Sequence, residues 1–103
     1  MAQYDIHRNT GLNTAIIPYM VVVQADLLDG LATRVVVPLV KRSEMRPATH
    51  LNPVFEIEGV EVVFSAAEIA VLTGDELTGE IVGNLGDEQA PMARALDFLF
   101  FGG

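Results

Sequence analysis

Short apolar runs that suit β-strands occupy most of the chain. Tyr4 and Ile6 alternate with Asp5 and His7, which is the pattern of a half-buried strand. Further strands are expected over residues 16–24, 34–40, 54–58 and 60–64, with a weaker one over 77–82. Glycines, prolines and polar residues separate these runs, as is typical of turns and loops. The pattern predicts a mainly β fold, with one helical turn over residues 65–69.

Two features of the predicted strands constrain their pairing. Pro38 lies within the strand 34–40 and has no N–H to donate to a β-ladder, so we expect an edge strand or a bulge there. The runs 54–58 and 60–64 are expected to form a hairpin, because Gly59 can supply the positive φ of a tight turn. The polar segment 41–52 between these strands is a predicted loop.

The end of the sequence has the pattern of an amphipathic helix that begins within residues 88–90. Pro91 suits the first turn of a helix, where its missing N–H has no partner to lose. Five apolar residues then follow the spacing of a core-facing stripe: Met92, Ala95, Leu96, Leu99 and Phe100. Many short strands followed by one helix predict a small antiparallel barrel or sandwich capped by a helix, as one domain over residues 1–103.

Two predicted surfaces carry apolar side chains. The helix face opposite the stripe shows Ala90, Arg94, Asp97 and Phe101, with Phe98 at its flank. A monomer does not normally leave two phenylalanines near water at a helix end. They either pack into a dimer seam or onto the barrel, or they form an aromatic hot spot for a partner with a polar rim. The second surface is the predicted turn 26–30, in which Leu27 and Leu28 stand between aspartates.

Charge and composition exclude several classes of function. Half of the 103 residues are apolar, and 14 acidic residues outweigh 6 basic ones to give a net charge of −8. Such a chain is repelled by nucleic acid and by anionic membranes. The absence of cysteine excludes disulfides, thiolate zinc sites and a thiol nucleophile. Residues 1–6 lack the basic start of a signal peptide, and no apolar run reaches bilayer length, so we expect a soluble cytoplasmic protein.

Candidate catalytic and metal-binding residues are sparse. Neither Ser43 nor Ser65 lies in a nucleophile elbow, and a triad built on His50 and Ser43 has no supporting motif. His7 and His50 lie too far apart in sequence to suggest a zinc site. We therefore expect no catalytic residue, metal or cofactor. A small hydrolase on an acidic β-barrel is the competing hypothesis, and it predicts an activity that is lost when His50 or one carboxylate is changed.

Two further charge patterns favour ordinary structural roles. The segment 83–86 has two glycines before the helix, like an anion-binding helix start, but Asp87 and Glu88 follow at once and would repel a phosphate. Lys41, Arg42 and Arg46 form a small basic concentration within the predicted loop. Three cations in a chain of this charge indicate a solvated loop rather than a nucleic-acid site.

Four segments together resemble the CcdB family, the toxins of plasmid toxin–antitoxin pairs. Residues 23–29 are similar to the family's Val-Gln-Ser-Asp-aliphatic-aliphatic-Asp segment, and residues 35–39 to its apolar run ending in Pro-Leu. Residues 51–57 are similar to its Leu-x-Pro-aliphatic strand, and residues 95–103 to its terminal helix, which ends aromatic-Trp-Gly-Ile. The segments occur in the family's order and at nearly its spacing, so the resemblance covers nearly all of the chain.

The resemblance implies both a fold and a function. The fold is a small, strongly bent antiparallel β-barrel or sheet of SH3-like type with a C-terminal α-helix, in a two-fold homodimer. A homodimer would also cover apolar side chains of the strand 35–40 that one barrel leaves exposed. The implied function is a toxin that binds the GyrA subunit of DNA gyrase and traps the cleaved-DNA complex. A CcdA-like antitoxin neutralises it, and the pair represses its own operon. Because the chain is acidic, operator DNA would be contacted through the antitoxin.

The resemblance also implies gyrase-binding residues. Ala25 stands at the position of a contacting serine, Leu27 and Leu28 match an aliphatic pair, and Gly102 is retained. Arg94 and Asp97 stand where the family often has amides, Phe101 replaces the usual Trp, and Gly103 replaces the terminal Ile. Losing an Ile from an interface core removes about 1.5–3 kcal/mol. An alternative is therefore a non-toxic CcdB-like protein that keeps antitoxin binding or a regulatory role without poisoning gyrase.

Overall fold

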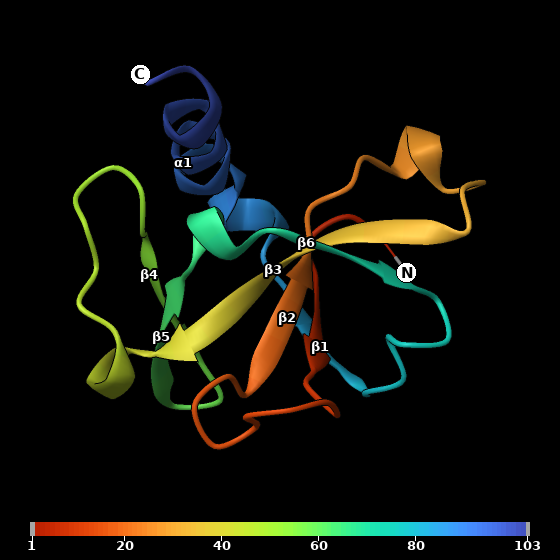
Figure 1. Cartoon of the computed structure of the whole chain (residues 1–103), viewed down its shortest axis with the longest axis horizontal. Helices are drawn as coiled ribbons and strands as arrows, with labels where there is room; N and C mark the ends of the chain where they lie inside the picture. Colours follow the sequence, from red (N-terminus) through yellow and green to blue (C-terminus); the bar gives the residue numbers. More distant parts are fainter. Residues whose placement is uncertain (1, 103) are drawn as a thin grey trace.

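A curved antiparallel sheet with a helix at one end forms the fold of residues 2–102, which are the residues that the computed structural model describes (Figure 1). The sheet order is β4-β5-β3-β2-β1-β7, and β6 also pairs with β3. The bounds are β1 Asp5–Arg8, β2 Tyr19–Val22, β3 Thr33–Lys41, β4 Val54–Ile57, β5 Val60–Phe64, β6 Ala70–Thr73, β7 Ile81–Asn84 and the helix α1 Gln89–Phe101. Short 3₁₀ turns are η1 Asp26–Leu28, η2 Arg42–Glu44, η3 Ala66–Glu68 and η4 Gly86–Glu88. The predicted mainly β class with a C-terminal helix is confirmed.

The long strand β3 organises the sheet because it changes partners along its length. It pairs with β2 on one side, and on the other with β6 through residues 33–36 and then with β5 through residues 39–41. Pro38 lies at this change of partner. Its carbonyl accepts a hydrogen bond from the Ser65 N–H at 3.1 Å, so its missing N–H faces the gap between β6 and β5. The expected edge strand is therefore wrong: Pro38 lies in a central strand at a place where no donor is needed.

The hairpin of β4 and β5 forms as the sequence predicts. Glu58 and Gly59 both have positive φ, 52° and 78°, as a two-residue turn of the favoured hand requires. Phe55 and Ile57 point into the core, while Glu56 on the other face is exposed. The turn therefore sets the register that buries the apolar face of the hairpin.

Several other expectations about the strands are incomplete. β6 is absent from the predicted strands, and the last strand lies at Ile81–Asn84 rather than over residues 77–82. β2 spans fewer residues than the predicted run 16–24. In β1, both Ile6 and His7 are buried, because the segment that holds Gly79 covers the second face of this strand and its carbonyl lies 3.3 Å from His7 Nδ1. The burial of His7 arises from tertiary cover, which a local pattern does not contain.

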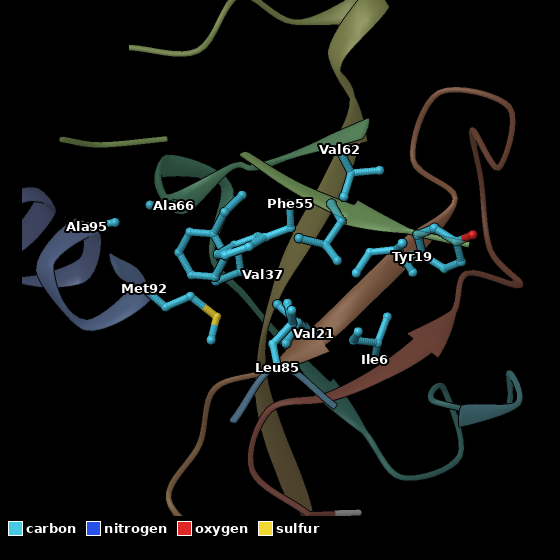
Figure 2. Close-up of a cluster of buried hydrophobic side chains, with 13 residues drawn as sticks. Ile6, Tyr19, Val21, Val37, Phe55, Val62, Ala66, Leu85, Met92 and Ala95 are labelled. Carbon is cyan, nitrogen blue, oxygen red and sulfur yellow. The ribbon is translucent and has the colours of Figure 1, made fainter. Parts of the chain in front are cut away.

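The hydrophobic core fills the concave side of the sheet and the space under the start of α1. Figure 2 shows Met92 and Ala95 of α1 pointing toward Ala66 of η3 and the rings at the centre of the sheet. Phe55 and Phe64 meet edge to face, with ring centroids 6.4 Å apart. Met92, Ala95, Ala66 and Phe64 have no exposed surface. This packing fixes α1 at one end of the sheet.

The predicted core stripe of the helix is correct except for its last residue. Met92 and Ala95 are buried, and Leu96 and Leu99 pack partly against the core. Phe100 is 61% exposed, so its expected core position is wrong. Figure 1 shows the reason: α1 rises away from the sheet, and its last turn extends beyond the elements that cover its start. Within residues 2–102, no helix has the length and apolar character needed to cross a bilayer.

We predict that Gly79→Ala destabilises the protein. A Cβ at residue 79 would lie 1.8 Å from the carbonyl oxygen of Arg8, so β1 and the chain before β7 would have to separate. The expected loss in the free energy of unfolding is about 1–3 kcal/mol, measured by urea denaturation. Gly30→Ala is the matched control, because nothing lies within 4 Å of a Cβ at that site. Equal stabilities of the two variants would contradict the close approach at Gly79.

Candidate functional site

The exposed end of α1 gathers aromatic side chains on the surface. The chain has five phenylalanines, of which Phe55 and Phe64 are buried in the sheet. The other three lie in the last turn of α1, where Phe98 is 38%, Phe100 61% and Phe101 81% exposed. The rings of Phe100 and Phe101 pack against each other with centroids 6.5 Å apart. An apolar cluster of this kind is typical of a protein-binding surface rather than of a helix that only supports a core.

Gly102 ends the helix directly after Phe101. Its φ of +75° is left-handed, and its N–H donates to the Phe98 carbonyl at 2.9 Å. A side chain at this φ would be strained, so glycine is needed to end α1 at this point. Gly102 thus fixes where the aromatic cluster stops. Gly103, another predicted site residue, lies outside the described residues.

Arg94 and Asp97 stand on the same side of α1 as Phe98 and Phe101. Both are exposed, as the sequence predicts for the face opposite the core stripe. They line a hollow of about 360 Å³ together with Phe98 and with His50, which lies in the loop before β4. The helix therefore presents aromatic side chains flanked by a cation and an anion, an arrangement that suits the centre and rim of an interface.

The turn η1 is a second exposed apolar surface. Leu27 is 94% and Leu28 49% exposed, and Ala25 before them is also exposed, as the predicted turn 26–30 requires. Gln24 holds this turn against β3: its side-chain N–H donates to the Leu28 carbonyl at 3.1 Å, and its side-chain oxygen accepts from the Val35 N–H at 3.0 Å. The two leucines are therefore displayed by a turn with a fixed backbone.

Arg34 also braces η1, a role that the sequence pattern did not predict. Its guanidinium is largely buried and binds both the carboxylate and the carbonyl of Asp29 at 2.8 Å. It also donates to the carbonyls of Leu31 and Thr33. The signal in the sequence is an arginine at the start of an otherwise apolar strand, where a charged side chain needs a partner.

The structure does not bring all of the predicted gyrase-binding residues together within one chain. Figure 1 shows the C-terminal end of α1 at the upper left and η1, in orange, at the upper right. Arg94, Asp97, Phe101 and Gly102 belong to the first surface, whereas Ala25, Leu27 and Leu28 belong to the second. The predicted residues thus form two separate surfaces within the single chain.

The candidate catalytic residues do not form a site. His50 packs against Phe98, with ring centroids 6.1 Å apart. Ser43 lines a different hollow, beside Lys41 and the hairpin turn. Among residues 2–102, no three His, Asp or Glu side chains cluster closely enough to hold a metal ion. Of the three cations in the loop 41–52, Arg42 forms an ion pair with Glu61 at 3.1 Å, so its charge is neutralised within the chain.

A cluster of charged and aromatic side chains lies at the hairpin turn, and its contacts change the pKa values of Glu58 and Tyr19. The Glu58 carboxylate accepts a hydrogen bond from the Tyr19 hydroxyl at 2.6 Å. Arg8 forms ion pairs with Glu58 at 3.1 Å and with Glu80 at 2.9 Å. Hydrogen bonds from Tyr19 and then Arg8 hold the pKa of Glu58 below its ordinary value. Burial, followed by the bond to Glu58, raises the pKa of Tyr19. The hydrogen bond and the two ion pairs together tie β1, β2 and the hairpin to one another.

Comparison with known proteins adds one finding. The family model described as "CcdB protein" matches residues 3–102, nearly the whole chain. No curated protein matches the chain.

We predict a pH-dependent stability difference between the wild type and Glu58→Gln. The folded state lowers the pKa of Glu58, so its carboxylate stabilises the fold at pH values above its ordinary pKa of 4.5. This contribution is lost as the pH falls through the lower folded-state pKa. The wild type should therefore have the higher Tm at neutral pH, and the difference should shrink in acid.

The control for this experiment is Glu44→Gln, which removes an exposed carboxylate from η2. Its Tm should follow that of the wild type across the same pH range. A Glu58→Gln difference that stays constant from pH 7 to acid would mean that the carboxylate contributes through its shape alone.

Proposed function

The chain belongs to the CcdB family, and on that premise we propose that it is a toxin that binds the GyrA subunit of DNA gyrase and holds gyrase on cleaved DNA. The CcdB family comprises gyrase-inhibiting toxins of toxin–antitoxin systems, which act on another enzyme's intermediate. The observation that carries the proposal is the exposed aromatic end of α1. Phe98, Phe100 and Phe101 are exposed there, although the chain buries its other two phenylalanines.

The proposed contact is centred on Phe101, Gly102 and Gly103, with Arg94 and Asp97 at its rim. Burying one large apolar side chain contributes about 1.5–3 kcal/mol, so a small number of rings can supply most of the energy of an interface. Aromatic rings also lose little conformational freedom on binding. Ala25, Leu27 and Leu28 are proposed as a second contact, separate from the helix end in one chain.

The proposed mechanism is a shift of population and requires no bond chemistry by the toxin. A protein that binds the cleaved gyrase–DNA complex more tightly than the resealed one moves the equilibrium toward cleavage. Turning a 1:99 ratio of cleaved to resealed complex into 99:1 requires about a 10⁴-fold difference in the toxin's affinity for the two complexes. A helix end fixed by buried Met92 and Ala95 presents a rigid surface that can make such a distinction.

We further propose a homodimer, but not to cover exposed apolar side chains of the strand 35–40. The strand 35–40 needs little cover from a second chain, because Val36, Val37 and Leu39 are fully buried within one chain. The remaining support is the apolar surface at Leu31, which is 53% exposed, and Val71, which is 61% exposed, together with the helix-end rings. A two-fold dimer would present each surface twice, as suits a two-fold target such as the GyrA dimer.

The proposed partners also include a CcdA-like antitoxin that neutralises the toxin and joins it in repressing the operon. The net charge of −8 supports contact with operator DNA through the antitoxin and not through this chain. The alternative is a family member that binds its antitoxin without poisoning gyrase. Its specific motivation is Phe101, which lacks the larger ring and the N–H donor of the family's Trp.

Expression without an antitoxin distinguishes these two functions. A gyrase poison should arrest growth and induce the response to DNA damage, and a resistance mutation in GyrA should relieve both. Normal growth with abundant folded protein would favour the non-toxic alternative. Growth arrest that the gyrase mutation does not relieve would indicate a different target.

Phe101→Ala should weaken binding to a GyrA fragment by about 2 kcal/mol or more, with little change in Tm. The reason is that Phe101 is 81% exposed and lies outside the core. Leu12→Ala is the control, because Leu12 is 87% exposed and belongs to the loop between β1 and β2. Figure 1 shows this loop at the opposite end of the molecule from the end of α1. Conversely, Phe101→Trp combined with Gly103→Ile should increase affinity. Unfolding of Phe101→Ala would place this ring in the core and refute the site assignment.

The homodimer predicts a mass near twice the 11.1 kDa of one chain in light scattering at micromolar concentration. Val71→Lys should shift the mass toward the monomer, since it places a charge on the exposed apolar face of β6. A wild-type mass that stays near that of a single chain would remove the dimer from the proposal.

A further inference from the structure

The turn formed by Ala48–Asn52 is anchored firmly to the sheet. Asn52 is buried, and its side-chain N–H donates to the Phe64 carbonyl at 3.1 Å. Its side-chain oxygen accepts the Ala48 N–H at 3.0 Å, and its backbone N–H donates to the Ala48 carbonyl at 3.0 Å. One asparagine thus closes the turn and joins it to β5, so the residues at its tip have fixed positions.

His50 occupies the tip of this turn in an unusual backbone conformation. Its φ is +71°, which is uncommon for a residue with a side chain and persists where the surrounding structure enforces it. The ring of His50 faces that of Phe98 across the gap to α1, with centroids 6.1 Å apart and planes inclined by 39°. This separation lies within the range of favourable aromatic pairs.

Phe98 needs such a partner because α1 extends beyond the core at this point. It is 38% exposed, and it lies between Arg94 and Asp97 on one side and the more exposed Phe101 on the other. A ring without a neighbour can adopt several rotamers, and freezing them on binding reduces affinity. His50 is placed to limit the motion of this ring in the free protein.

We propose that His50 is a positioning residue for partner binding: it orients Phe98, and the Ala48–Asn52 turn forms the second wall of the binding surface on α1. The hollow that His50 shares with Arg94, Asp97 and Phe98 is then part of the contact. This inference rests on the proposed binding of GyrA. It adds His50, a loop residue 44 positions before Arg94 in sequence, to a surface that is otherwise made by one helix.

A double-mutant cycle tests the proposal with four proteins: wild type, His50→Asn, Phe98→Ala and the double variant. Asn tolerates positive φ, so His50→Asn keeps the turn and removes the imidazole ring. It should weaken binding to the GyrA fragment about 3- to 10-fold, the scale of one aromatic pair. In the Phe98→Ala background the same change should have less than about a 2-fold effect.

Two further variants separate positioning from general damage to the turn. His50→Phe keeps a flat ring and should retain affinity within about 2-fold of the wild type. Ser43→Ala changes an exposed residue of the same loop outside the Ala48–Asn52 turn and should leave both affinity and Tm unchanged. The imidazole proton resonances of His50, measured by NMR in the free protein, should move in Phe98→Ala because the neighbouring ring current is lost.

The outcomes distinguish this inference from the proposed function. If the wild type does not bind the GyrA fragment, the proposed function fails and this inference fails with it. If the wild type binds and His50→Asn binds equally well, only the role of His50 is overturned. An undiminished effect of His50→Asn in the Phe98→Ala background would show that His50 acts independently of Phe98, which overturns positioning through that ring.

Discussion

The change of partner along β3 is the constraint from which the positions of both exposed apolar surfaces follow. At its start, β3 carries Arg34 and receives Gln24, and these two side chains hold η1. At its far end it pairs with β5, and Ser65, which follows β5, donates to Pro38. Ala66 comes next and packs under α1. One strand thus sets η1 at one side of the sheet and the helix at the other.

Hydrogen bonds fix the backbone at both exposed apolar surfaces, the turn η1 and the end of α1. Gln24 and Arg34 hold the turn with Leu27 and Leu28, Asn52 holds the turn opposite Phe98, and Gly102 caps the helix after Phe101. Exposed apolar side chains on flexible segments would lose much of their binding energy to ordering on association. The hydrogen bonds provide that order before any partner arrives.

The sequence predicts those parts of the structure whose cause is local. The hairpin around Gly59, the exposed turn with Leu27 and the start of the helix near Pro91 follow from turn chemistry and periodicity. β6 and the exposure of Phe100 depend on which distant elements lie nearby, and periodicity contains no such information. The resemblance of residues 95–103 identified the aromatic helix end as a candidate contact, whereas the particular partners of Arg34 and His50, Asp29 and Phe98, become visible only once the chain is folded.

The Glu58 turn has a consequence for the order in which the chain folds. A two-residue turn of this hand normally has Asn, Asp or Gly at its first position, and these residues let a hairpin form by itself. Glu58 is less suited to that backbone, and its carboxylate instead binds Tyr19 and Arg8, which are 39 and 50 residues away in sequence. The hairpin therefore reaches full stability only with the N-terminal strands in place. The rate of folding should accordingly be governed by long-range loop closure rather than by an early local nucleus.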